Sequence, residues 1–217
     1  MPVRKTESQK AYEAIRGAIL SGRFKPGDRL PQRRLADEFG ATTITVREAF
    51  RSLENEGLVA IEPKWGAMVV EITRERVFGR YVVREALEGM AARLAAGHIT
   101  PVVREELLSQ AAQVDKTLVR DDVGAAEKAH IHYQLHERIA ELSECDELRV
   151  QLRKLNLHTI ILSNASILDW SDYTDEWHQT LVRVISEGDP DEAEKMMRIH
   201  VRRGFEMESK ALGPDAE

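Results

Sequence analysis

The sequence is poor in cysteine, in aromatic residues and in long apolar runs. Cys145 is the single cysteine among 217 residues, which excludes an internal disulfide framework and a multi-cysteine zinc ribbon and is typical of a reducing compartment. No run approaches the roughly 18 apolar residues of a membrane helix, and the N-terminal stretch lacks the apolar centre of a signal peptide. We therefore expect a soluble, cytoplasmic protein without a membrane partner.

Charge is distributed unevenly along the chain. The 37 acidic and 31 basic residues give a net charge of −6, so the whole molecule is not a basic coat for nucleic acid. Residues 1–72 hold 12 Lys/Arg and 10 Asp/Glu, whereas residues 73–217 hold 19 and 27 and contain all seven histidines. This contrast predicts two domains with different roles, at 1–72 and 73–217.

The first domain is predicted to hold three short helices followed by a hairpin. Apolar residues recur at helical spacing in three segments, and a glycine follows each segment. Two β-like runs then flank the turn-forming residues 62–66. The helical segments are about 12–20, 35–39 and 43–56, and the β-like runs are 58–61 and 67–70. This order indicates a winged helix-turn-helix.

A winged helix-turn-helix reads DNA with the N-terminal residues of its second motif helix, here about 43–56. Hydroxyl groups and a guanidinium at that end would contact bases or phosphates of double-stranded DNA. Two arginines of the preceding helix would grip phosphates, and a cation and a glycine at the wing tip would approach a minor groove. The candidates are Thr42, Thr43, Thr45, Arg47, Arg33, Arg34, Lys64 and Gly66. The alternatives are a salt bridge for Arg47 and simple solvation for Arg34.

The second domain is predicted to be an all-α bundle, which makes the chain mainly α. Thr100-Pro101 and Asp189-Pro190 are helix starts, and Gly97 is a helix stop. The apolar periodicity predicts about six helices. Their ranges are roughly 74–96, 101–119, 122–142, 146–163, 171–187 and 190–211.

Four histidines of this domain are candidates for a metal site. His132 and His136 are four residues apart and lie on one helix face, while His178 and His200 fall on the last two helices. A bundle gathers such side chains around an interior site. Imidazoles suit zinc, nickel, copper or iron and disfavour calcium or magnesium. An accidental pair remains the alternative, and His98, His130 and His158 are expected to lie outside the site.

Several N-terminal segments together resemble the GntR family of bacterial transcription regulators. The matching stretches are 20–30, 35–36, 46–49 and 53–59, within a resemblance that covers about residues 9–71. It implies that Arg47 and the loop residue Thr42 lie at the DNA. Thr43 stands where the family has a second DNA-contacting arginine, and Thr45 where it usually has proline. We therefore expect a different operator sequence, not a loss of DNA binding.

Residues 75–211 look like the FCD domain of the FadR branch of that family. The motifs are Arg84–Glu88, Leu135–Ile139, Trp177-His178, Gly188-Asp189 and Met197–His200. The resemblance implies a divalent metal, held by one aspartate and three histidines, at which a small carboxylic acid binds. His136, His178 and His200 match the histidines, and His132 stands in place of the aspartate. Either four histidines form a site that prefers zinc or nickel, or His132 is held back from three.

The resemblance also implies residues that contact the effector. Arg84 matches a position that anchors the effector carboxylate, a role that suits a bidentate guanidinium. The alternative is an ion pair with Glu88, four residues along the same helix. Asn156, Asn164 and Trp177 are further pocket candidates, and a core position is the alternative for Trp177.

Together these patterns predict a homodimeric transcriptional repressor that reads a palindromic operator and responds to a small carboxylate. A regulator that responds to the metal ion itself is the alternative. A metal-dependent hydrolase is disfavoured because no His-Glu-x-x-His sequence or nucleophile elbow occurs. We therefore predict that the protein is not an enzyme.

Overall fold

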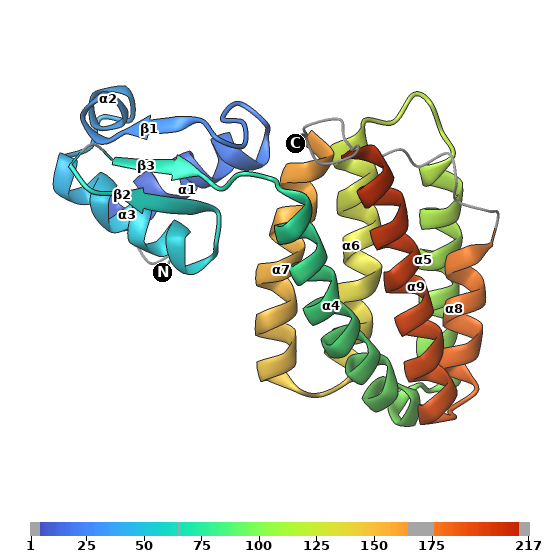
Figure 1. Cartoon of the computed structure of the whole chain (residues 1–217). Helices are drawn as coiled ribbons and strands as arrows, with labels where there is room; N and C mark the ends of the chain where they lie inside the picture. Colours follow the sequence, from blue (N-terminus) through green and yellow to red (C-terminus); the bar gives the residue numbers. More distant parts are fainter. Residues whose placement is uncertain (1–4, 65, 165–175, 213–217) are drawn as a thin grey trace. The chain divides into compact units, whose positions relative to one another are not determined.

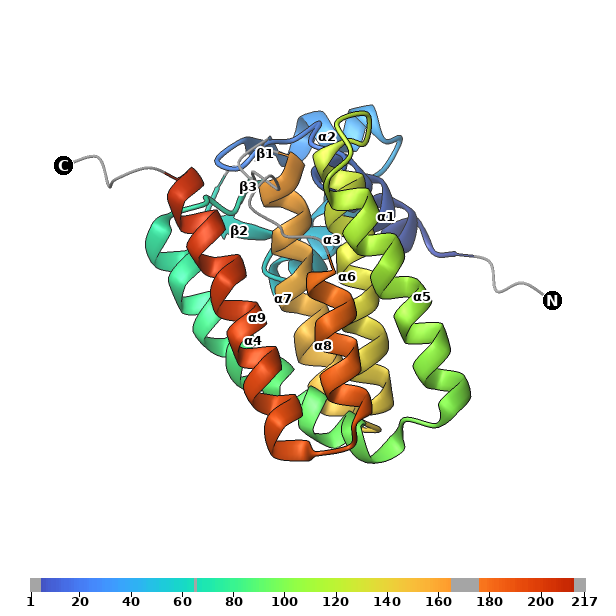
Figure 2. The same ribbon diagram turned by 90° about the vertical axis from the view of Figure 1, so that its right-hand side faces the viewer.

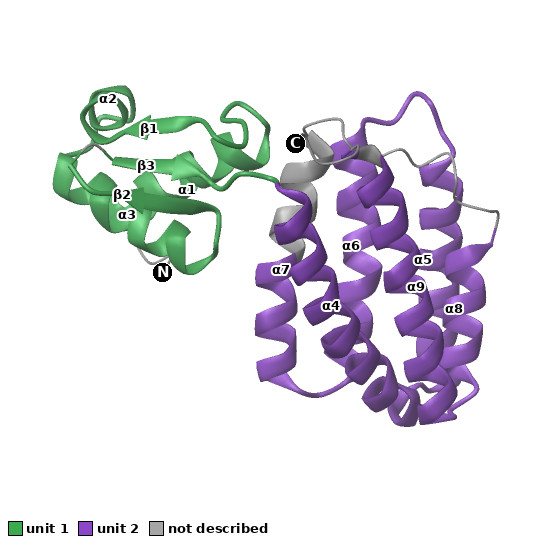
Figure 3. Ribbon diagram, in the orientation of Figure 1, with its two compact units in different colours: residues 1–72, 160–165 green, residues 73–159, 166–217 purple. Residues whose placement is uncertain are grey.

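The computed structural model describes residues 5–64, 66–164 and 176–212, without the side chains of 156–164 and 211. The chain is mainly α, as the sequence predicts (Figure 1). It divides into two compact units, residues 1–72 with 160–165 and residues 73–159 with 166–217 (Figure 3). Within the described ranges, every helix is too short or too polar to cross a membrane.

The first unit is a winged helix-turn-helix, and the three predicted helices and the hairpin are all present. Its core forms where α1 packs against α3 and buries Ile15, Ile19, Phe50 and Leu53. The elements are α1 (Glu7–Leu20), β1 (Arg29–Pro31), α2 (Gln32–Glu38), α3 (Thr43–Asn55), β2 (Val59–Glu62) and β3 (Gly66–Val69).

Strand β1 was not predicted from the sequence. It pairs antiparallel with β3, so that the strand order is β1-β3-β2. Three residues that end in proline show no alternation long enough to reveal a strand. The pairing depends on Gly66, whose φ is 139° and whose ideal Cβ would lie 2.2 Å from the carbonyl oxygen of Leu30. Only glycine fits this close approach.

The second unit contains the six predicted helices, with a short 3₁₀ turn after the first (Figure 2). The start predicted at 171 for the fifth helix lies outside the described residues, which place its first residue at Trp177. Helix α4 packs against α9, and α5 packs against α6 and α8. The elements are α4 (Arg74–Ala95), η1 (Ala96–His98), α5 (Pro101–Leu118), α6 (Ala125–Leu142), α7 (Asp146–Asn164), α8 (Trp177–Ser186) and α9 (Pro190–Ala211).

The core of this bundle contains a concentration of polar side chains. Helix α4 buries Arg84 and Glu88 on the same side as Val77, Ala91 and Ala92. Histidines of α6, α8 and α9 are buried with them. Burial of polar groups costs free energy unless they are paired, so the partners of these side chains indicate the function of the bundle interior.

Candidate metal centre and nucleic-acid interface

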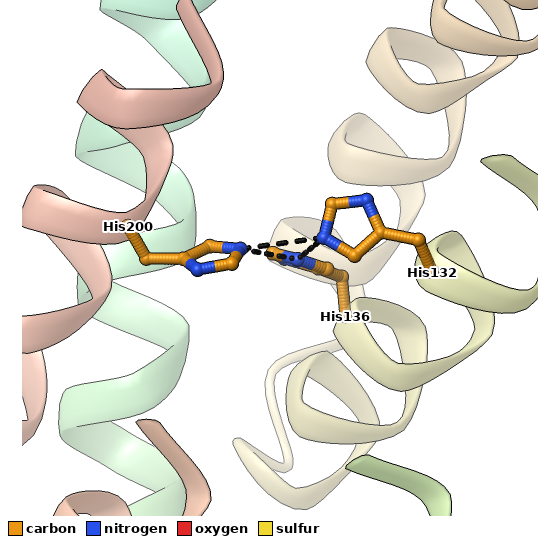
Figure 4. A group of neighbouring side chains, drawn as sticks. All are labelled: His132, His136 and His200. Carbon is orange, nitrogen blue, oxygen red and sulfur yellow. Dashed lines mark hydrogen bonds between the residues drawn. The ribbon is translucent and has the colours of Figure 1, made fainter. Parts of the chain in front are cut away.

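Three imidazoles converge inside the second unit (Figure 4). His132 and His136 extend from successive turns of α6, and His200 extends from α9. The Nε2 of His136 lies 2.9 Å from that of His132 and 3.1 Å from that of His200, and the Nε2 atoms of His132 and His200 are 3.3 Å apart. Nitrogen ligands of a tetrahedral zinc ion lie about 3.3 Å from each other, given Zn–N bonds near 2.0 Å. The three nitrogens therefore fit one divalent metal ion.

His178 of α8 lies beside this trio. Its ring centroid is 4.7 Å from that of His132 and 5.0 Å from that of His200, and the side chain is fully buried. The structure thus brings together all four histidines that the sequence selected. His132 is part of the converging trio.

Two carboxylates that the sequence does not link to the histidines, Glu88 and Asp115, orient these rings. Glu88 pairs with the Nδ1 of His136 and accepts a hydrogen bond from the Nε of Arg84 at 2.7 Å. Asp115 of α5 accepts from the Nδ1 of His178 at 2.6 Å. A carboxylate on Nδ1 keeps the proton there and leaves the lone pair on Nε2, which is how metal-binding histidines are oriented.

Asp115 also fixes the start of α8. Its carboxylate accepts hydrogen bonds from the backbone N–H groups of His178 and Gln179, at 3.0 and 3.2 Å. The residue at the usual capping position, Glu176, has a left-handed backbone (φ 64°) and forms no side-chain cap. The carboxylate from α5 therefore replaces a local cap, so that one side chain sets both the helix start and the orientation of His178.

The N-terminal end of α3 presents the residues predicted to meet DNA. Thr43 and Arg47 are exposed there, as are Arg33 and Arg34 of α2 and Lys64 in the wing turn. The hydroxyl of Thr42 caps the helix by accepting from the N–H of Thr45 at 3.1 Å. This bond and the 2.8 Å contact between the two hydroxyls hold the start of α3.

Two residues of this surface lie where the sequence does not predict them. Gly66 was expected at an exposed wing tip, but it is buried in β3 against Leu30, where the sheet requires a residue without a side chain. Ile44 was missed, although 61% of it is exposed on the first turn of α3. Its signal was an isoleucine between threonines, outside the apolar face of the predicted helix.

Comparison with known families decides the identity of both units. The family model "Bacterial regulatory proteins, gntR family" matches residues 7–69, and the FCD domain model matches residues 80–203. The chain belongs to the GntR family. Its two matched domains are those of GntR transcriptional regulators with an FCD domain, which are non-enzymes.

Individual relatives support the same assignment at modest identity. The GntR protein is 29% identical over 147 residues to YdhC of Bacillus subtilis and 27% identical over 143 residues to the transcriptional repressor RspR of Escherichia coli. These matches cover 67% and 64% of this chain but only 64% and 60% of the relatives. The solved structure of E. coli McbR/YncC shares the fold, with a TM-score of 0.74 over 95% of this chain and 99% of that one, at 17% identity.

The surroundings of His132, His178 and His200 in this GntR protein favour neutral rings. Burial lowers the pKa of His132 and of His200 well below the ordinary histidine value, and the neighbouring imidazoles lower both further. Burial also lowers the pKa of His178, although Asp115 opposes this shift. Neutral imidazoles are the form that binds metal ions.

Glu88 is the ionised counterpart of this cluster. Burial by itself would raise the pKa of Glu88, but Arg84 and His136 lower it to about 2. Arg84 is only 6% exposed, and it pairs with Glu88 on the same helix. The ion pair that the sequence left as the alternative is thus present, and Arg84 lies next to the histidines through Glu88.

The remaining predicted pocket residues divide into two groups. Trp177 is partly buried and touches the cluster, because its indole N–H donates to the Nδ1 of His200 at 2.7 Å. The side chains of Asn156 and Asn164 lie outside the described residues.

The other histidines were expected to lie outside the site. His98 contacts the carbonyl of Leu142 at 2.9 Å, and His130 contacts the side chain of Gln134 at 3.2 Å. Both are exposed and outside the cluster. The side chain of His158 is not among those described.

Proposed function

We propose that this GntR regulator is a homodimeric repressor whose affinity for a palindromic operator is set by a small carboxylic acid. The acid binds at a divalent transition metal, zinc or nickel, held in the histidine cluster. One observation supports this proposal most strongly: three buried Nε2 atoms from two helices lie within 3.3 Å of one another.

The donor set favours a metal that accepts an anion. Three or four imidazoles leave the ion's double positive charge uncompensated by a ligand, since Glu88 and Asp115 meet the rings of His136 and His178 at Nδ1 and not at the Nε2 atoms that would hold the ion. When bound, such an ion acts as a Lewis acid toward a carboxylate. The chain's own residues hold the rings, keep Nε2 unprotonated at His136 and His178, and exclude bulk water.

The DNA-contacting surface is proposed at α3. Arg47 suits a bidentate contact with guanine or a phosphate, and the hydroxyl of Thr43 suits either group. Ile44, with 61% of its surface exposed, is suited to the methyl group of thymine. Positively charged residues beside them would contact phosphates, namely Arg33, Arg34 and Lys64, while Thr42 and Thr45 hold the helix start.

Dimerisation is proposed through the second unit. Helix α4 exposes five large apolar side chains between 39% and 55%, more than solvent-facing positions of a helix usually carry. They are Phe78, Val82, Val83, Met90 and Leu94. A twofold dimer with this face at its centre would present two reading heads to a palindrome. Sedimentation equilibrium of the full chain should give twice the 24.6 kDa chain mass.

The metal proposal is tested by zinc titration of metal-stripped protein. The wild type should bind one ion per chain, and His136→Ala and His200→Ala should each abolish stoichiometric binding while the helical content is retained. His98→Ala is the matched control, because His98 lies outside the cluster. Full occupancy in both cluster variants would rule out these ligands.

The sensing proposal is tested by DNA affinity. An operator selected from random duplexes should be released when a small carboxylic acid is added to zinc-loaded protein, as seen by fluorescence anisotropy. If zinc alone shifts the affinity and no acid does, the protein is instead a metal-responsive regulator. The composition of the trio favours this second candidate, because its three imidazoles bring no negative charge and the bound ion itself therefore changes the charge of the cluster.

A further inference from the structure

The hydrogen bond between Trp177 and His200 fixes which nitrogen of the His200 ring carries the proton. Trp177 is the first residue of α8, and its Nε1 donates to the Nδ1 of His200 at 2.7 Å. An indole N–H can only donate. The Nδ1 of His200 is therefore an acceptor and carries no proton.

The proton of a neutral His200 must consequently be on Nε2. That atom faces the Nε2 atoms of His136 and His132, at 3.1 and 3.3 Å. His136 and His178 differ in this respect, because a carboxylate on Nδ1 leaves their Nε2 atoms free of a proton. The Trp177 bond thus fixes His200 in the tautomer that cannot ligate a metal through Nε2.

Ligation of a metal through Nε2 would require the proton of His200 to move to Nδ1. The ring N–H would then point at the indole N–H across 2.7 Å, and two donors cannot share a hydrogen bond. The Trp177 hydrogen bond and ligation by His200 are therefore mutually exclusive.

We infer that Trp177 competes with a metal ion for His200 and is released when the cluster is loaded. The inference rests on the proposed metal site. Arg203 lies one turn beyond His200 on α9. It supports the indole in the hydrogen-bonded position, since its guanidinium carbon lies 4.7 Å from the Trp177 ring centroid. Metal occupancy is then signalled at the start of α8, while Asp115 keeps His178 in place.

The tautomer of His200 provides the first test. In ¹⁵N-labelled metal-stripped protein, long-range ¹H–¹⁵N spectra should show His200 protonated at Nε2. Zinc should move that proton to Nδ1 and shift the indole N–H signal of Trp177, which Trp177→Phe identifies. A His200 protonated at Nδ1 before zinc is added, or a Trp177 signal that zinc leaves unchanged, would overturn the inference.

Zinc affinity provides the second test, which is decided by whether the affinity rises or falls when Trp177 is replaced. Trp177→Phe removes the competing donor, so the affinity should rise about three- to ten-fold, the value of one ordinary hydrogen bond. A purely structural role for Trp177 predicts a fall instead. Arg203→Ala should give a smaller rise, and Arg202→Ala, which loses only an exposed pair with Glu85, should give none.

The two proposals fail in distinguishable ways. If wild-type protein binds no zinc, the metal site is wrong and this inference is overturned with it. If the wild type binds zinc and Trp177→Phe binds it equally or more weakly, only the competition is overturned. If Trp177→Phe does not fold, Arg203→Ala and the wild-type tautomer decide.

Discussion

Glu88 joins a buried cation to the histidine cluster of the second unit. It is 2% exposed and links Arg84 to His136, so it serves both the ion pair and the ring orientation. Removing one member of a buried pair leaves the other charge without compensation. We therefore expect Glu88→Gln to lower the free energy of unfolding by about 3 kcal/mol and zinc affinity at least ten-fold, as measured by urea denaturation and zinc competition.

The control for this change is Glu85→Gln on the same helix. Glu85 pairs with Arg198 and Arg202 near the surface, where ion pairs contribute about 0–1 kcal/mol. Equal losses of stability and zinc affinity in the two variants would show that Glu88 has no special link to the histidines.

Ile44 provides a residue-scale test of base reading. If its side chain contacts a thymine methyl, replacing that thymine by uracil should weaken wild-type binding by about 1 kcal/mol. Ile44→Ala should weaken binding to the thymine operator by a similar amount and should be insensitive to the uracil substitution. Anisotropy titrations of both proteins on both duplexes give the comparison, and additive losses would place Ile44 away from the methyl group.

The four clustered histidines could be selected from the sequence, but their orienting carboxylates could not. The i, i+4 spacing of His132 and His136 survives any change of neighbours, because the helix itself imposes it. Glu88 and Asp115 meet their histidines across 48 and 63 residues of chain. Only the packing of α4 on α6, and of α5 on α8, creates those contacts.

At the scale of elements, α8 depends on a side chain from another helix. Asp115→Asn keeps the size of the side chain but removes the negative charge of the carboxylate. That carboxylate accepts hydrogen bonds from two backbone N–H groups and from the ring of His178. We expect a loss of about 1–2 kcal/mol in unfolding free energy and about ten-fold weaker zinc binding. Denaturation and zinc titration measure the two effects.

Asp121→Asn is the matched control, since Asp121 is exposed in the turn after α5. An Asp115→Asn protein as stable as this control, with unchanged zinc affinity, would contradict the capping role.

Helices were more predictable than the sheet because their signals are local. Thr100 and Asp189 cap α5 and α9 where the sequence places them, through bonds to the next few residues. Strand β1 exists only because β3 lies beside it, and Gly66 permits that approach. The same dependence explains why Gly66 was assigned to a DNA-facing tip when it serves the sheet.

At the scale of the whole molecule, a metal should stabilise only the unit that contains the cluster. Zinc at 100 times its dissociation constant adds about 2.7 kcal/mol to the stability of the binding state. Hydrogen exchange should slow in α6, α8 and α9 and remain unchanged in α1–α3, which belong to the other compact unit. Equal slowing in both units, or slowing confined to the first, would contradict the assignment of the cluster as the metal centre.

The join between the reading head and the helical bundle is short. Strand β3 ends at Val69 and α4 begins at Arg74, so the four intervening residues span at most about 14 Å. Because the connection is this short, the winged helix should be exchangeable as a unit: a different winged helix in place of residues 1–72 should bring new promoters under the control of the proposed effector. The half-site spacing would stay with the bundle, and lengthening the tether with glycine and serine should relax it.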